Sequence, residues 1–125
     1  MLRATMLATG LLGAAGVAVA ASEDDFVVAD TNDLVALCTA PADSEHRVAA
    51  LNFCHGYAVG AFQYYQMLEP VGPGHRFVCV EEPKPTRDDV IAGFVAWAQT
   101  RPEYGGEPAV ESLLRYLSET HPCPK

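Results

Sequence analysis

The sequence predicts an all-α fold: a small four-helix (or similar) bundle linked by two disulfide bonds. Apolar residues recur at three- and four-residue steps in four separate segments, which is the period of an amphipathic helix. The one β-prone run has no second run with which to pair, and a single strand does not form a sheet. The four cysteines are an even number in a short chain, which favours two bridges. Helix packing is therefore the expected origin of the core.

The chain begins with a segment typical of a secretory signal peptide. Arg3 gives a positive start, an apolar stretch covers residues 4–17, and small residues occupy 18–21. The apolar stretch is shorter than the ~20 residues that cross a bilayer, so a membrane anchor is the weaker alternative. We expect residues 1–21 to be cleaved, after Ala20 or Ala21, and the mature protein to be periplasmic without membrane contact.

The mature part suits one domain. Residues 22–30 are expected to form a flexible acidic lead-in, and residues 31–125 a helical domain large enough for a single core. Removal of Arg3 leaves seven basic against sixteen acidic residues, a formal charge of −9 with the histidines neutral. This balance argues against a nucleic-acid partner, because phosphates attract clustered Lys and Arg. It suits a basic protein partner, although an acidic surface also serves solubility alone.

Two helices are expected in the first half of the domain. Thr31 or Asn32 caps a short helix that ends before Pro41. A longer helix begins after a cap at residues 43–44 and runs to about Leu68, where Pro and Gly residues stop it. Its apolar stripe consists of Val48, Leu51, Cys54, Ala58, Ala61, Phe62 and Tyr65.

Four residues of the helices have unusual positions. Gly56 and Gly60 lie four apart in the long helix, where each glycine costs up to ~1 kcal/mol relative to alanine. They favour close packing of another backbone, with tolerated defects as the alternative. Tyr64 and Trp97 lie off the main apolar stripes, so of the helix aromatics these two are the ones expected to face a partner.

The second half is expected to hold an extended strap and two helices. The β-prone run at residues 77–80 forms the strap, which lies across the helices. Thr86 followed by Asp89 approximates a capping box for a helix that stops before Pro102. Pro108 fits the first turn of the last helix, and the tail after it anchors the chain through Cys123.

The cysteines allow three pairings, of which Cys38–Cys54 with Cys79–Cys123 is favoured because each pair joins segments that can be neighbours. The chain-entropy model gives about 3 kcal/mol for the first loop and about 4 kcal/mol for the second. Zinc is a weak rival, because none of the gaps is a ligand pair of two to four residues. We expect no metal and no cofactor.

No catalytic constellation is found. Cys54 adjoins His55, but consecutive residues of a helix do not face each other, and Cys54 lies on the apolar stripe. The acidic pairs at 81–82 and 88–89 are explained by solvation and by the helix dipole. The protein is therefore not expected to be an enzyme.

The segments around the cysteines follow one another in a definite order: Asp33-Leu34 to Cys38, Cys54-x-Gly56-Tyr57-x-x-Gly60-Ala61, Phe77-Val78-Cys79-Val80, Arg101-Pro102-Glu103 and Pro122-Cys123. From Asp33 to Cys123, this order resembles the Rap/Tai family of type VI secretion amidase immunity proteins. The resemblance implies an all-helical, exported and often dimeric protein that binds a type VI secreted peptidoglycan amidase and occludes its active site. Two departures are the late prolines after the third cysteine and Trp97 in place of a tyrosine.

The family's task is binding, so no catalytic residue carries over and the partner surface is inferred from the residues themselves. Glu103, Tyr104 and Glu107 offer an aromatic anchor flanked by acids, on a loop in which Gly105-Gly106 is a hinge that lets it protrude. An ordinary interhelical loop is the alternative. A protein partner is expected. Because members of the family are often dimeric, the resemblance also implies that this chain forms a homodimer. A periplasmic acid- or stress-response chaperone, or an orphan helical protein, is the other class; chaperoning requires exposed apolar surface.

Overall fold

The computed structural model describes residues 21–71 and 73–125. Its α-helices are α1 (Thr31–Cys38), α2 (Arg47–Leu68), α3 (Arg87–Gln99) and α4 (Ala109–Thr120). Four short 3₁₀ helices accompany them: η1 (Asp24–Val27), η2 (Glu69–Val71), η3 (Pro73–His75) and η4 (Pro102–Tyr104). Within these two ranges the β-type pairing amounts to one isolated bridge, between Val78 and Pro122. The prediction of a small all-α domain is confirmed.

The expected signal peptide lies outside the described residues, except for Ala21 at its end. Among the helices from residue 21 onward, leaving aside residue 72, none combines the length and apolarity needed to cross a membrane. The expected acidic lead-in contains η1, and Asp25 accepts a hydrogen bond from the Ser22 hydroxyl at 3.2 Å.

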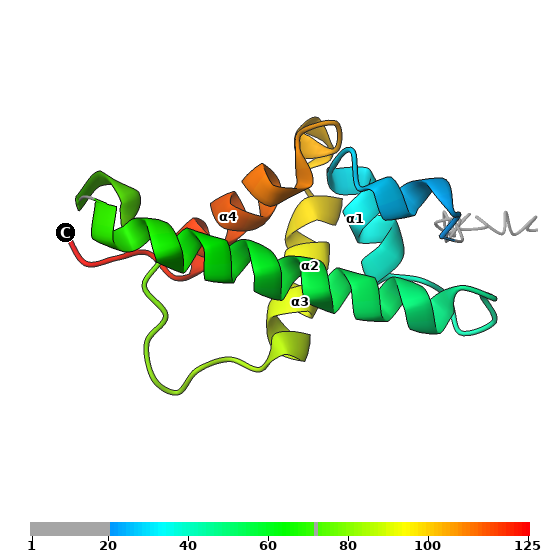
Figure 1. Ribbon diagram of the computed structural model, residues 1–125, viewed down its shortest axis with the longest axis horizontal. Helices are drawn as coiled ribbons and strands as arrows, with labels where there is room; N and C mark the ends of the chain where they lie inside the picture. The colour runs from blue at the N-terminus through cyan, green and yellow to red at the C-terminus, as the bar shows by residue number, and fades with distance from the viewer. Residues whose placement is uncertain (1–20, 72) are drawn as a thin grey trace, which may run out of the picture.

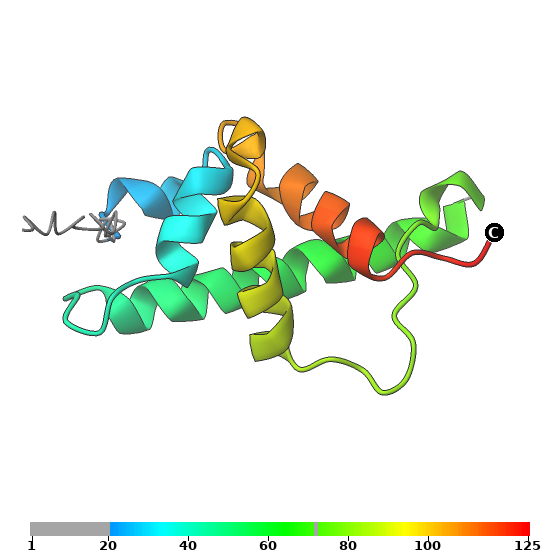
Figure 2. The ribbon, with the colours of Figure 1, turned by 180° about the vertical axis from the view of Figure 1, so that it is seen from behind.

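The helices are arranged on one side of α2. Figure 1 shows α2 running along the length of the molecule, with α1, α3 and α4 behind it. From behind, the same three helices lie in front of α2, and α3 crosses it steeply (Figure 2). Among residues 21–71 and 73–125, no other helix lies on the opposite side of α2. The buried residues of α2 are accordingly few and mostly small: Ala50, Cys54, Ala58 and Tyr65.

The core forms where α1, α3 and α4 meet that side of α2. The side chains of Leu34, Leu37, Phe94 and Leu113 are at most 1% exposed, and each such burial contributes roughly 1.5–3 kcal/mol. Aromatic rings extend this core: Phe94 contacts Tyr116 edge-on, with ring centroids 6.0 Å apart. The packing of these side chains therefore holds α1, α3 and α4 against α2.

Two capping boxes begin helices. At α1 the cap is Asp30, because its backbone is extended and its carboxylate accepts the Asp33 N–H at 3.1 Å. The expectation that Thr31 or Asn32 caps this helix is wrong. At α3 the predicted box is confirmed: Asp89 N–H donates to the Thr86 hydroxyl at 3.1 Å, and the Asp89 side chain accepts from the Thr86 backbone. The Thr86 side chain lowers the pKa of Asp89, with a smaller contribution from the Thr86 backbone.

Three expectations about buried faces are wrong. Val48 is 74% exposed, because α2 begins at Arg47 and extends past the helices that cover it. A Cβ atom built on Gly56 or Gly60 would meet no atom within 4 Å, so no backbone from the described part of the chain packs there. Trp97 is only 7% exposed and belongs to the core, whereas Tyr64 is 64% exposed.

Both disulfide bonds have the favoured pairing. Cys38 joins α1 to α2, and Cys79 joins the extended strap to the C-terminal tail at Cys123. The strap is also hydrogen-bonded: Cys79 N–H donates to the His121 carbonyl at 2.8 Å. The Tyr65 hydroxyl of α2 accepts the N–H of Phe77 at 2.9 Å. These contacts hold the strap against both α2 and the end of α4.

Candidate protein-binding site

The predicted binding residues lie between α3 and α4, on η4 and the turn that follows it. Glu103 is exposed, whereas Tyr104 and Glu107 are half-buried. In Figure 1 this segment forms a rounded end of the molecule beside the start of α1. The structure therefore brings the three residues together on one loop, but only Glu103 points its full side chain at solvent.

The loop is tied to the first turn of α1. Thr31 donates both its backbone N–H, at 2.9 Å, and its hydroxyl, at 3.0 Å, to the Glu107 carbonyl. The Asn32 N–H donates to the Gly105 carbonyl at 3.0 Å. Because residues about 75 positions apart are joined by these bonds, the loop is a fixed part of the fold.

The expected hinge at Gly105-Gly106 is wrong for Gly105. This residue is buried, and a Cβ atom on it would lie 2.7 Å from two atoms of the Asn32 side chain. Glycine is present because α1 approaches the loop closely, not because the loop needs to bend. Gly106 is exposed and its Cβ position is open.

Tyr104 is part of a four-residue stack, which we call the aromatic stack and which consists of Arg101, Trp97, Tyr104 and Arg115. The Trp97 and Tyr104 rings are nearly parallel, at 5°, with centroids 5.4 Å apart. The Arg115 guanidinium lies 4.6 Å from the Tyr104 centroid, and that of Arg101 lies 4.8 Å from Trp97. Such cation–π contacts contribute about 0.5–2 kcal/mol each, depending on desolvation.

Acidic side chains complete the outer ends of the stack. Arg115 forms ion pairs with Glu107 at 3.2 Å and with Glu111 at 3.4 Å. At the other end, Arg101 lies 3.6 Å from the Glu119 carboxylate, which also accepts from Trp97 Nε1 at 2.7 Å. Glu107 is therefore engaged within the chain. The Tyr104 ring is sandwiched rather than projecting, and the charge that the loop presents outward is that of Glu103.

Sequence reasoning missed the residues that stiffen this loop. Arg115 was detectable, because Glu111 and Arg115 have the i,i+4 spacing of a helical ion pair. The stacking of Trp97 on Tyr104 gave no local signal, since one ring lies on α3 and the other on η4. The anchoring by Thr31 likewise joins positions far apart in the chain.

The structure also bears on the rejected catalytic interpretation. The Cys54 sulfur is bonded to Cys38, so it is not a free thiol. His55 Nε2 lies 3.7 Å from the Asp88 carboxylate instead. Across residues 21–71 and 73–125, no three His, Cys, Asp or Glu side chains are grouped so that they would hold a metal ion.

The comparisons with known proteins give one match. A family model described as Rap1a immunity proteins matches residues 30–123, which is most of the chain. No curated protein and no solved structure matches the chain.

Proposed function

Because the chain belongs to the Rap1a immunity protein family, we propose that it protects the cell that makes it by binding a secreted peptidoglycan amidase and occluding the active site. The match over residues 30–123 carries this proposal, and membership of an immunity family implies a protein effector as partner. The effector's chemistry and the mode of inhibition are the parts that need a test.

The stiff loop between α3 and α4 supports inhibition by occlusion. A loop already held by hydrogen bonds from Thr31 and Asn32 loses little conformational freedom when a partner binds it. Its exposed Glu103 precedes Tyr104, whose ring is stacked on Trp97 and so fixes the loop from inside. A rigid segment of this kind, with one exposed carboxylate, suits a fixed contact with an enzyme's surface.

The charge of the chain supports a basic effector. The formal net charge is −8, and acids outnumber bases by two to one. Complementary charge accelerates association and makes it sensitive to salt. The association rate with the effector is therefore expected to fall as ionic strength rises, while the dissociation rate changes less.

An immunity protein is expected to be encoded beside its effector, so the test uses a secreted hydrolase from a neighbouring reading frame. Cells that direct this hydrolase to their periplasm are expected to survive only when the chain is co-produced, and the purified chain is expected to inhibit peptidoglycan cleavage at a one-to-one ratio. Glu103→Lys reverses a charge on the loop, and Glu45→Lys makes the same reversal at another exposed loop position. The first variant is expected to lose affinity and protection, and the second to retain both.

Each result has a separate meaning. Failure of the unaltered chain to protect would contradict the immunity proposal for this effector. Equal affinity of the Glu103→Lys variant would show that another surface binds, even if protection holds. Tyr104 and Glu107 are poor choices for this test, because both make stabilising contacts with Arg115 inside the chain.

Export is part of the same proposal. Residues 1–21 have the order of a signal peptide, and two disulfide bonds suit an oxidising compartment such as the periplasm. Fractionation followed by mass spectrometry is expected to find the mature chain in the periplasm, beginning at Ala21 or Ser22. A cytoplasmic chain that still carries Arg3 would contradict this.

A homodimer through the uncovered side of α2 is also proposed. Tyr64 and Met67 are 64% and 73% exposed there, and Gly60 on the same helix leaves its Cβ position open, so a second helix can approach. Gly60→Arg is expected to give a monomer in light scattering, whereas Ala96→Arg, at an exposed position of α3, leaves a dimer. An unaltered chain that is monomeric, and that suppresses aggregation of unrelated proteins at low pH, would instead favour the chaperone.

A further inference from the structure

A long apolar groove lies at the opposite end of α3 from the candidate binding loop. Its cavity volume is about 680 Å³, within the range of roughly 300–1,000 Å³ typical of small-molecule sites. One wall is a stripe of α2 from His55 to Gln66, which at 1.5 Å per residue is about 16 Å long. The groove is therefore elongated rather than round.

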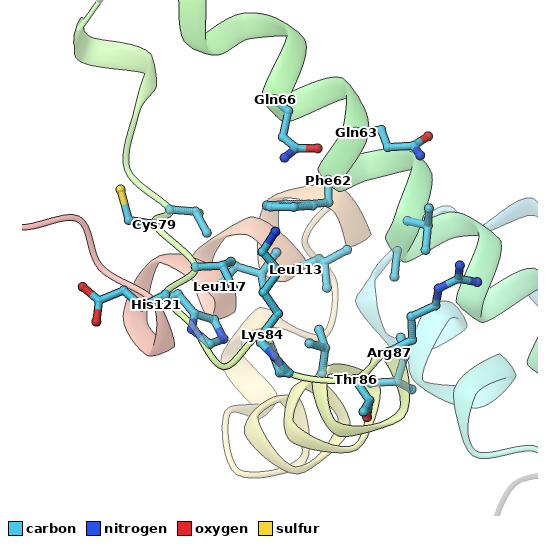
Figure 3. A pocket seen from close by; sticks show the side chains of 18 of the residues that line it. Phe62, Gln63, Gln66, Cys79, Lys84, Thr86, Arg87, Leu113, Leu117 and His121 are labelled. Atoms are coloured by element: carbon cyan, nitrogen blue, oxygen red, sulfur yellow. The ribbon is translucent and has the colours of Figure 1, made fainter.

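Apolar side chains from three elements make its floor. Figure 3 shows Phe62 of α2 reaching toward Leu113 and Leu117 of α4 in the middle of the groove. Val78 and Val80 of the strap line it as well. An occupant with a flexible hydrocarbon chain would remove this surface from water, at roughly 25 cal/mol per Å².

Three basic side chains, Arg76, Lys84 and Arg87, line the groove around this apolar floor. In Figure 3, Thr86 and Arg87 lie at one edge, where α3 begins, and the Lys84 side chain extends from the segment before them toward Phe62. Arg87 lies at the His55 end, since its neighbour Asp88 pairs with His55. Arg76 lines the other end, next to Phe77, whose N–H donates to Tyr65 of α2. In a chain whose net charge is −8, this concentration of positive charge is unusual.

The carboxylates nearby are already engaged. Glu82 pairs with Lys84 at 3.7 Å, and Asp89 accepts from the Thr86 hydroxyl at 2.7 Å. Asp88 lies 3.7 Å from His55. Glu81 is the one carboxylate among the groove-lining side chains. Within the described residues, no carboxylate lies within the 4 Å of an ion pair from the guanidinium of Arg87, and the positive end of the α3 dipole adds to its field.

We propose that this groove binds an unbranched fatty carboxylate, with its chain along Phe62, Leu113 and Leu117 and its carboxylate at Arg87. A guanidinium donates two parallel N–H bonds to the oxygens of a carboxylate, which gives direction to an otherwise apolar contact. The amidase of the proposed function is a different occupant, because the groove carries the wrong charge for a basic protein. The two sites are separated by the length of α3, about 20 Å.

Calorimetry with dodecanoate, kept below its micellar concentration, tests the proposal. Saturable one-to-one binding is expected, with dodecanol at least about tenfold weaker because it lacks the charge. Acetate, which has the charge without the chain, is expected not to compete. Absence of saturable binding would overturn the proposal, and so would equal affinity for dodecanol.

Matched variants locate the carboxylate. Arg87→Gln is expected to weaken dodecanoate binding about tenfold and to leave dodecanol binding unchanged. Arg76→Gln removes the same charge from the other end of the groove and is expected to have no effect. Val59→Trp, which places an indole in the groove from its half-buried wall position, is expected to block binding at an unchanged melting temperature. Equal affinities for the Arg87→Gln variant and the unaltered chain would refute the assignment.

Discussion

Replacement of Gly93 by alanine tests how closely α3 and α4 approach. A Cβ atom on Gly93 would overlap the Tyr116 hydroxyl oxygen and lie 3.1 Å from Tyr116 Cζ. The phenol has little room to move, because Tyr116 is 7% exposed and its ring contacts those of Phe94 and Trp97. Overpacking of this kind costs about 1–3 kcal/mol, against a gain of up to ~1 kcal/mol in helix propensity. A net destabilisation of about 1 kcal/mol is expected.

The reasoning is checked by a double-mutant cycle in urea unfolding at one protein concentration. Tyr116→Phe removes the overlapping oxygen, so Gly93→Ala in that background is expected to be neutral or stabilising, and the coupling between the two changes to be about 1–3 kcal/mol. Gly56→Ala is the control: it is also in a helix, its Cβ position is open, and it is expected to stabilise. If Gly93→Ala behaves like Gly56→Ala, or has the same effect in both backgrounds, the close approach of α3 and α4 is wrong.

Three other outcomes are expected. Thr31→Val removes a buried hydroxyl that donates to the Glu107 carbonyl, so it should lower the free energy of unfolding by about 1–3 kcal/mol in urea titration, whereas Thr31→Ser should cost less. Replacement of Cys79 and Cys123 by alanine should cost about 4 kcal/mol through the lost loop constraint, and an unchanged urea midpoint would contradict that. Burial raises the pKa of Tyr57 and Tyr116 above the ordinary 10.0. The stability that these phenols contribute is therefore present below pH 10 and is lost as pH rises through their folded pKa values. In a titration followed by phenolate absorbance, both should ionise at a higher pH than free tyrosine does.

Much of the candidate site was visible in the sequence, but its energetics were not. Glu103, Tyr104 and Glu107 were identifiable as an aromatic residue between acids in a loop between helices. Their exposure differs because Tyr104 stacks on Trp97 and Glu107 pairs with Arg115. Neither partner is adjacent in sequence, so a local pattern had no means of distinguishing the free carboxylate from the engaged one.

The groove proposed to take a fatty carboxylate shows the same limit more strongly. Phe62 and Leu113 each carry the spacing of an ordinary core position, and Arg87 that of a solvated helix start. Only the strap, held by Cys79–Cys123 and by Tyr65, places them around one cavity. A cavity is a property of several segments at once, and no one segment predicts it.

The sequence alone determined the helical class, the helix ends near prolines and the Thr86 capping box, because each depends on residues a few positions apart. The tertiary structure decided which side of α2 is covered. The apolar period of α2 predicted that Val48 is buried, and the glycine spacing predicted close packing at Gly60, yet Val48 is 74% exposed and the Cβ position of Gly60 is open. Periodicity identifies a face that is able to be buried, whereas burial itself requires a partner surface, and the positions of the partner helices follow from contacts between residues far apart in the chain.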